Sequence, residues 1–120
     1  MLRVGVDMIE VRRIAEALAR HGDRFLMRCF TLGEQTTCAG AAPRLAARFA
    51  AKEAVAKALG TGIGAVRWVE IEVVSDSEGR PSVHLHGDAA RLAHALRLTT
   101  WEISLTHTDD QALAFVVAMG

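Results

Sequence analysis

The order of apolar and polar residues at the start of the chain predicts a strand followed by a helix. Val4 and Val6 alternate with polar or small residues in Leu2–Asp7, which is the period of a β-strand. In Glu10–Arg20, apolar residues recur every three or four positions, as they do in an amphipathic helix. Further elements follow from the same patterns: a helical turn at Arg24–Phe30, a short helix from the capping box at Thr31 to about Ala39, a helix at Pro43–Leu59, a hairpin of Val66–Val74 and Pro81–His86, a helix from a cap at Asp88 to about Leu98, and a hairpin of Trp101–Thr106 and Ala112–Met119.

The helix predicted at Pro43–Leu59 is apolar on two sides. One face carries alanine only, at positions 47, 50, 51, 54 and 58, and a second apolar face lies roughly opposite. Such a helix is sandwiched either within the domain or between the domain and a neighbouring subunit. Its charged residues therefore emerge from narrow strips between packed surfaces, where a charge usually has a partner or a function. These residues are Arg48, Lys52, Glu53 and Lys57.

This order of elements predicts a single α+β domain over residues 1–120, with a mainly antiparallel sheet packed on the long central helix. Of the 120 residues, 51% are hydrophobic and 23% charged, which is typical of a soluble globular domain. Aromatic residues make up only 5%, which argues against a base-stacking nucleic-acid protein. No apolar run is long enough for a membrane span or a signal peptide. Because Cys29 and Cys38 fit no metal or redox spacing, we expect reduced thiols in a cytoplasmic protein.

Charge is distributed unevenly along the chain. Residues 1–67 carry 11 Lys and Arg against 6 Asp and Glu, whereas residues 68–120 carry 3 against 8. This asymmetry favours an anionic partner for the first part, although the two parts could also pair with each other. Twelve of the 14 basic residues are arginine, so Lys52 and Lys57 are the exceptions. A compact ammonium is a candidate for specific chemistry at these two positions.

Two carboxylates and a lysine are the main candidates for chemistry. Asp7 ends an apolar strand, where it either caps a turn or binds a ligand. Glu53 and Lys57 are spaced for a helix salt bridge, and the packed surroundings leave a functional role equally open. If Asp7 and Glu53 converge, the two carboxylates suit Mg²⁺, which also takes water and phosphate oxygens. Lys57, Lys52 and Arg48 would then complete a phosphate-binding pocket.

Two further segments remain ambiguous at this level. Gly60–Gly64 is rich in glycine, but it follows a helix instead of opening one, so it is not a P-loop and reads first as a helix stop. His107 follows a predicted strand at a turn. It suits a phosphate contact or a base as well as a hydrogen bond within the turn.

Together, three segments resemble one family. They are Gly5–Ile14, with the pattern G-V-D followed by R-I, Arg48–Gly64, with R-F-A-A-K-E-A-V-A-K-A-L-G, and Ile103–Thr108, with S-L-T-H. Phe25–Glu34 fits the stretch between the first two. The order and spacing resemble those of holo-acyl-carrier-protein synthases, the small class of 4′-phosphopantetheinyl transferases, over the full chain. Ala56 stands where some members have serine.

The resemblance implies transfer of the phosphopantetheine arm from coenzyme A to a serine of acyl carrier protein in fatty acid biosynthesis, with release of adenosine 3′,5′-bisphosphate. It implies Mg²⁺ on Asp7 and Glu53, and catalytic roles for Glu53 and Lys57. Glu53, Lys57 and a metal-bound water remain rival bases. Contacts with coenzyme A are implied for Arg48, Lys57, Gly60, Gly62 and His107.

The resemblance also implies an acidic carrier protein as partner and a trimer with active sites at subunit interfaces. Basic residues of the first helices then become docking candidates, where they would otherwise form a solvated face. They are Arg13, Arg20, Arg24 and Arg28. Three alternatives stay open: a non-catalytic module that binds coenzyme A or a nucleotide, a structural protein that binds an acidic helix, and a transferase that serves polyketide or peptide synthases.

Overall fold

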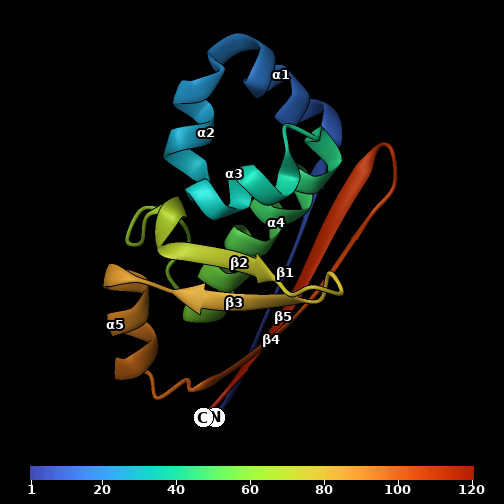
Figure 1. Cartoon of the computed structure of the whole chain (residues 1–120). Coiled ribbons are helices and arrows are strands. Elements are labelled where there is room, and N and C mark those ends of the chain that lie inside the picture. Colours follow the sequence, from blue (N-terminus) through green and yellow to red (C-terminus); the bar gives the residue numbers. More distant parts are fainter.

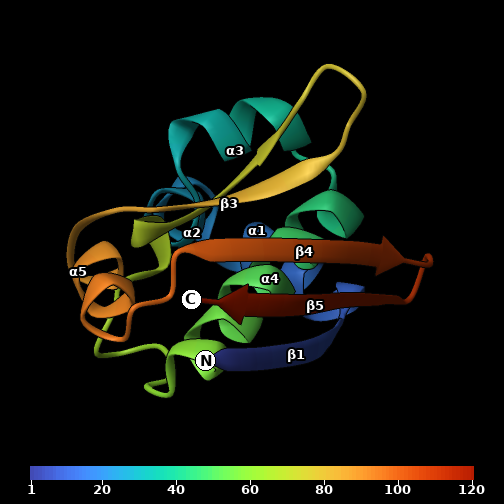
Figure 2. The same cartoon turned by 90° about the horizontal axis from the view of Figure 1, so that it is seen from below.

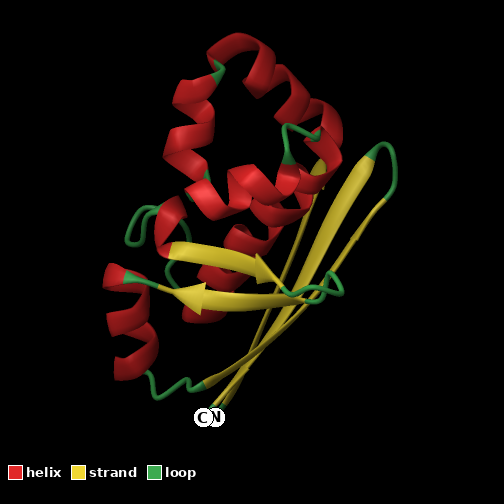
Figure 3. Cartoon of the chain, viewed as in Figure 1, coloured by secondary structure: helices red, strands yellow, loops and turns green.

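The computed structural model describes all 120 residues and confirms an α+β fold around one long helix (Figure 1). Its elements in chain order are β1 (Leu2–Glu10), α1 (Val11–His21), α2 (Asp23–Cys29), α3 (Leu32–Cys38), α4 (Ala42–Leu59), the 3₁₀ helix η1 (Trp68–Glu70), β2 (Ile71–Ser75), β3 (Pro81–Leu85), α5 (Gly87–Ala95), β4 (Thr100–His107) and β5 (Gln111–Met119). The first three helices gather at one end of the molecule (Figure 3). No helix combines the length and apolarity that a membrane span requires.

Two antiparallel sheets enclose α4. The larger sheet has the strand order β1-β5-β4, and the smaller is the β2-β3 hairpin. Figure 2 shows the three strands of the larger sheet side by side with α4 behind them. The predicted antiparallel arrangement is therefore confirmed.

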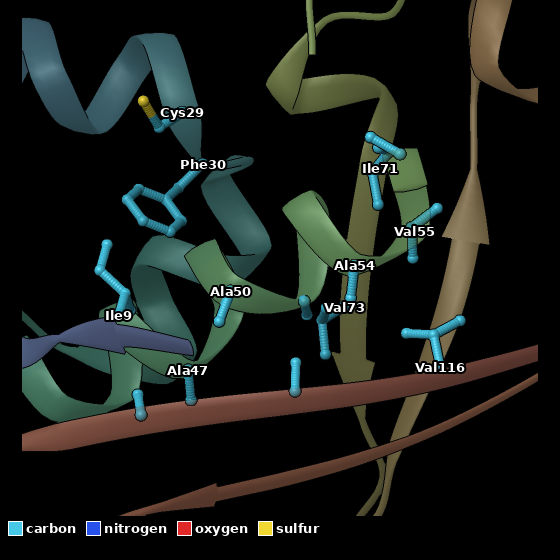
Figure 4. Packing of buried hydrophobic residues seen from close by; sticks show 14 of the residues in the cluster. Ile9, Cys29, Phe30, Ala47, Ala50, Ala54, Val55, Ile71, Val73 and Val116 are labelled. Atoms are coloured by element: carbon cyan, nitrogen blue, oxygen red, sulfur yellow. The ribbon is translucent and has the colours of Figure 1, made fainter. Parts of the chain in front are cut away.

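Small side chains let α4 pack directly on the larger sheet. The alanine face of the helix is buried, and the strand residues facing it are also small: Ala112, Ala114, Val116 and Ala118. A Cβ atom on Gly5 would lie only 1.9 Å from the carbonyl oxygen of Ala54, so the closest approach needs glycine. On another side of α4, Val55 lies near Ile71 of β2 (Figure 4). Both apolar faces are thus covered within the chain, and the alanine face is not available to a neighbouring subunit.

Three predicted boundaries were wrong. The first strand continues past Asp7 to Glu10, since these residues pair with β5 as far as Gln111. A 3₁₀ helix stands in place of the first part of the strand predicted at Val66–Val74. Asp88 lies inside α5 and does not cap it, because its backbone N–H donates to the Glu70 carboxylate at 2.7 Å.

The face of the larger sheet turned away from α4 is apolar and exposed. On β1 it presents Leu2, Val4, Val6 and Met8, each at least half exposed. Their partners across the ladder on β5 are also apolar: Met119, Val117, Phe115 and Leu113. This uncovered face is a surface that a monomer of this size rarely keeps in water.

The two ends of the chain lie together, where β1 begins and its neighbour β5 ends (Figure 1). The amino group of Met1 donates to the carbonyl of Gly120 at 2.7 Å, and the Gly120 N–H donates back to the carbonyl of Met1 at 3.1 Å. Elsewhere, Cys29 and Cys38 are free and buried, and burial raises the pKa of both thiols. Both are therefore unreactive structural residues.

Candidate active site

Asp7 and Lys57 form an ion pair between β1 and α4. The ammonium of Lys57 lies 3.0 Å from Asp7 Oδ1 and donates a second hydrogen bond to the Val6 carbonyl, also at 3.0 Å. The Asp7 side chain is only 20% exposed, whereas that of Lys57 is 52% exposed. The pair is thus open to solvent on the lysine side, where a ligand could reach both charges.

Glu53 lies close enough to Asp7 to be affected by its charge. Burial is the main cause that raises the pKa of Glu53, and the Asp7 carboxylate raises it further against the opposing charge of Lys57. Two neighbouring carboxylates at the edge of a packed helix are costly when both are ionised. A cation between them would remove this cost, so the arrangement is typical of a site that binds one.

The donor set at this position fits a hard divalent cation. No three His, Cys, Asp or Glu side chains form a cluster that could hold a metal by themselves. A cation on Asp7 and Glu53 would therefore take its other ligands from water or substrate. Mg²⁺ is bound in this way, through one or two carboxylates and phosphate oxygens.

Arg48 and His107 lie at one hollow of about 240 Å³. They come from α4 and from the end of β4, so the fold brings together two residues 59 positions apart. Arg48 is 7% exposed and donates to Ser75 Oγ at 3.0 Å and to the Arg44 carbonyl at 3.3 Å, while its buried Nε has no partner. An unpaired buried donor favours an anionic ligand here.

Lys52 does not belong to this pocket, contrary to the expectation from sequence. Its side chain is fully buried, and its ammonium donates to Glu34 Oε1 at 2.7 Å and to the carbonyls of Trp68 and Ile71. Glu34 in turn accepts from the backbone N–H of Thr31 and of Val73. Lys52 therefore ties α4 to α3, η1 and β2, and its role is structural.

Gly60 and Gly62 form the stop that follows α4. Both have positive φ, 84° and 66°, and the Gly60 N–H closes the last helical turn on the carbonyls of Ala56 and Lys57. The helix-stop interpretation is confirmed. Their contact with a ligand stays a prediction; they lie three and five residues after Lys57.

Sequence reasoning missed three polar residues that line the hollow at Arg48. They are Arg44, Ser75 and Ser104. Arg44 could have been found, because it lies one helical turn before Arg48. The two serines lie on β2 and β4, and only the packing of both strands around α4 places them here.

Comparisons with known proteins agree with this geometry. A family model described as "4'-phosphopantetheinyl transferase superfamily" matches residues 3–116. The holo-[acyl-carrier-protein] synthase of Herpetosiphon aurantiacus is 50% identical, with both chains covered completely. The chain belongs to the 4′-phosphopantetheinyl transferase superfamily.

Solved structures of the superfamily have the same fold. The Neisseria meningitidis holo-[acyl-carrier-protein] synthase is 34% identical and superposes with a TM-score of 0.88 over 98% of each chain. The Helicobacter pylori enzyme, in complex with coenzyme A, is 26% identical, with a TM-score of 0.89 over 97% of this chain and 99% of that one. The resemblance drawn from the three sequence segments is therefore confirmed.

In this member of the superfamily, the docking candidates of the first two helices are free of acidic partners. Arg13, Arg20, Arg24 and Arg28 are exposed, and only their neighbour Arg12 forms ion pairs, with Glu10 and Glu16. None of the chain's ion pairs joins the basic first part to the acidic second part. The positive charge of the first part is thus not neutralised by ion pairs with the second part.

Proposed function

We propose that the protein is a Mg²⁺-dependent holo-acyl-carrier-protein synthase, which moves the 4′-phosphopantetheine arm from coenzyme A to a serine of apo acyl carrier protein. Adenosine 3′,5′-bisphosphate is the second product. The observation that carries the proposal is the meeting of Asp7, Glu53 and Lys57 between β1 and α4, together with a hollow lined by Arg48 of the same helix and by His107. Relatives named as holo-[acyl-carrier-protein] synthases, one 50% identical over the whole chain, support it.

The two phosphate-bearing parts of coenzyme A match the two charged regions of α4. Arg48 precedes Glu53 by five residues and Lys57 by nine, which is about 8 and 14 Å along the helix axis. The reacting pyrophosphate belongs at Asp7, Glu53 and Lys57, and the ribose 3′-phosphate belongs at Arg48 and His107. Gly60 and Gly62 let the backbone approach the ligand beside Lys57.

The reaction is an in-line displacement at phosphorus. The serine oxygen of the carrier forms a P–O bond as the bond to the leaving phosphate breaks, and negative charge grows on the leaving oxygen. Lys57 stabilises this charge, and either Glu53 or Lys57 takes the serine proton. Mg²⁺ held by Asp7 and Glu53 would supply further charge neutralisation when bound.

The carrier docks on the exposed arginines of the first two helices, Arg13, Arg20, Arg24 and Arg28. Acyl carrier proteins are acidic, and unpaired surface arginines attract such a partner and orient it. Because no acidic residue of the chain neutralises these four side chains, the surface keeps its full positive charge for the partner.

A homotrimer covers the exposed apolar face of the larger sheet. Val4, Val6, Met8 and Phe115 are 57%, 50%, 63% and 44% exposed, so the face is a continuous apolar surface. A second copy of the chain would bring an equal apolar face to cover it, and the resemblance to holo-acyl-carrier-protein synthases supports a total of three copies. We place the active sites at the subunit interfaces, as the resemblance implies; Asp7 lies on the same strand as this face, next to Val6 and Met8, with its side chain toward Lys57 of α4.

We place the activity in the cytoplasm, in fatty acid biosynthesis.

The test of the transfer reaction is mass spectrometry of apo acyl carrier protein incubated with the protein, coenzyme A and Mg²⁺. The carrier should gain the mass of one phosphopantetheine arm, with adenosine 3′,5′-bisphosphate in equal amount. Binding of coenzyme A without modification of any acyl, polyketide or peptide carrier would instead identify a non-catalytic binding module.

A further inference from the structure

Arg3 lies at the contact between the start of β1 and the last turn of α4 (Figure 2). Its guanidinium donates to the carbonyl oxygen of Ala58 at 3.3 Å, and its Nη1 atom would lie 3.0 Å from a Cβ atom placed on Gly60. The side chain is half-buried and forms no ion pair with any carboxylate of the chain. Neither the proposed metal site nor the phosphate and carrier contacts involve this cation.

The hydrogen bond from Arg3 supplies a donor that the end of α4 lacks. The last four carbonyls of a helix have no partner within it. The Ala56 carbonyl accepts from three backbone N–H groups of the following loop and the Lys57 carbonyl from one, whereas none of these groups donates to the Ala58 carbonyl. A cation at the C-terminus of a helix is also favoured by the helix dipole. Arg3 therefore fixes the last turn of α4 to the strand that carries Asp7.

Lys57 makes a second contact between the last turn of α4 and β1. Its ammonium donates to Asp7 and to the Val6 carbonyl. In the proposed function, the same ammonium turns to the pyrophosphate of coenzyme A, so the ligand competes with these two contacts. The Arg3 hydrogen bond lies one residue farther along the helix and uses no atom assigned to the ligand. It therefore persists when the ligand engages Lys57.

We infer that Arg3 is a positioning residue for the transfer reaction, which holds the last turn of α4 on β1 so that Lys57 stays beside Asp7 while its ammonium faces the ligand. The inference rests on the proposed function. It adds a residue to that function that touches neither the substrate nor the metal. Because a displacement of about 1 Å can cost about a hundredfold in rate, even a partial loosening of this turn should lower kcat.

Arg3→Met removes the donor and keeps an apolar stem. It should lower kcat about tenfold and change the KM for the carrier less than about twofold, because the docking arginines are intact. Arg3→Lys should recover most of the lost kcat, since a lysine ammonium can donate to the same helix-end carbonyl. The matched control is Arg91→Met on α5, an exposed arginine far along the chain from the charged cluster, and it should change kcat less than about twofold.

A double-mutant cycle with Lys57 tests whether Arg3 acts through that residue. If it does, Arg3→Met should change kcat/KM less than about twofold once Lys57→Ala is present. Calorimetric titration with coenzyme A gives the same comparison without transfer, and Arg3→Met should raise the Kd only where Lys57 is present. An equal loss in both backgrounds, or an unchanged kcat in Arg3→Met, would overturn the inference and leave the proposed function intact. A protein that binds no coenzyme A and modifies no carrier would overturn both.

Discussion

The ammonium of Lys57 lies 3.0 Å from Asp7 Oδ1, although the two residues are 50 positions apart in the chain. The contact depends on Gly5, because a side chain there would collide with the carbonyl of Ala54 and push α4 away from β1. Close packing of β1 on α4 thus brings Asp7 next to the charged residues Glu53 and Lys57.

Transfer should depend strictly on a divalent cation. Two carboxylates bind Mg²⁺ weakly enough for a chelator to remove it. Treatment with EDTA followed by buffer exchange should abolish modification of the carrier, and added Mg²⁺ should restore it. Asp7→Ala and Glu53→Ala should abolish transfer while their thermal unfolding stays cooperative. Full activity after EDTA treatment would contradict the metal assignment.

Glu53→Gln should stabilise the fold at neutral pH while it abolishes transfer. Burial and the Asp7 charge raise the pKa of folded Glu53 above its ordinary value of 4.5, so ionisation is less favourable in the folded chain. The stability that the protonated carboxyl contributes is complete below the unfolded pKa and is lost as pH rises through the folded pKa. Urea unfolding should therefore show a gain for Glu53→Gln at pH 7 and a much smaller gain near pH 4. A loss at pH 7 would instead indicate a stabilising salt bridge between Glu53 and Lys57.

Lys52→Met should destabilise the protein by about 3–5 kcal/mol, because it leaves the Glu34 carboxylate buried without its cation. Lys52→Met combined with Glu34→Gln should recover part of this loss, since no uncompensated charge remains. Denaturant unfolding measures both variants. A loss below about 1 kcal/mol in the single variant would show that Glu34 is stabilised by its backbone donors alone.

Lys52 and Lys57 show how much of this site could be predicted from the sequence. Helical spacing predicted that Glu53 and Lys57 share a face, and the strand-end position made Asp7 a candidate, so the central cluster could be found. The same reasoning placed Lys52 with Lys57 and Arg48 in a phosphate-binding pocket. Its burial depends on η1 and β2 covering that flank of α4, and the turn at Trp68 was predicted as strand. Helical periodicity gives the direction of a side chain, whereas tertiary packing decides what covers it.

A charge in the exposed apolar face should dissociate the proposed trimer. Val6 pairs across the ladder with Phe115 in the middle of this face, so Val6→Asp would bury a carboxylate in each interface. Sedimentation should give three times 12.9 kDa for the unchanged protein at micromolar concentration and 12.9 kDa for the variant. Ser77→Asp, in the exposed β2-β3 turn, is the control for added charge. An unchanged protein that sediments at 12.9 kDa would contradict the assembly.

Reversing the charge of Arg13, Arg20 and Arg24 together should weaken recognition of the carrier and leave the binding of coenzyme A unchanged. Replacement by Glu should raise the apparent KM for the carrier at least about tenfold. In the unchanged protein, the rate of transfer to the carrier should fall as the salt concentration rises. The affinity for coenzyme A should change less than about twofold, because Arg48, Lys57 and His107 are intact. Carrier kinetics and coenzyme A titrations on the same variant decide the point. Identical carrier kinetics would return these arginines to an ordinary solvated face.

Met1 and Gly120 are joined by two hydrogen bonds, so the two ends of the backbone are already in contact. A peptide linker of a few residues could join the two ends with little loss of loop entropy, and new ends could then be opened in the exposed turn at Asp76–Gly79. Circular permutation at that turn would leave β1 and β5 paired and α4 uncut. The charged cluster of Asp7, Glu53 and Lys57 would then sit in the interior of the permuted chain, far from either terminus.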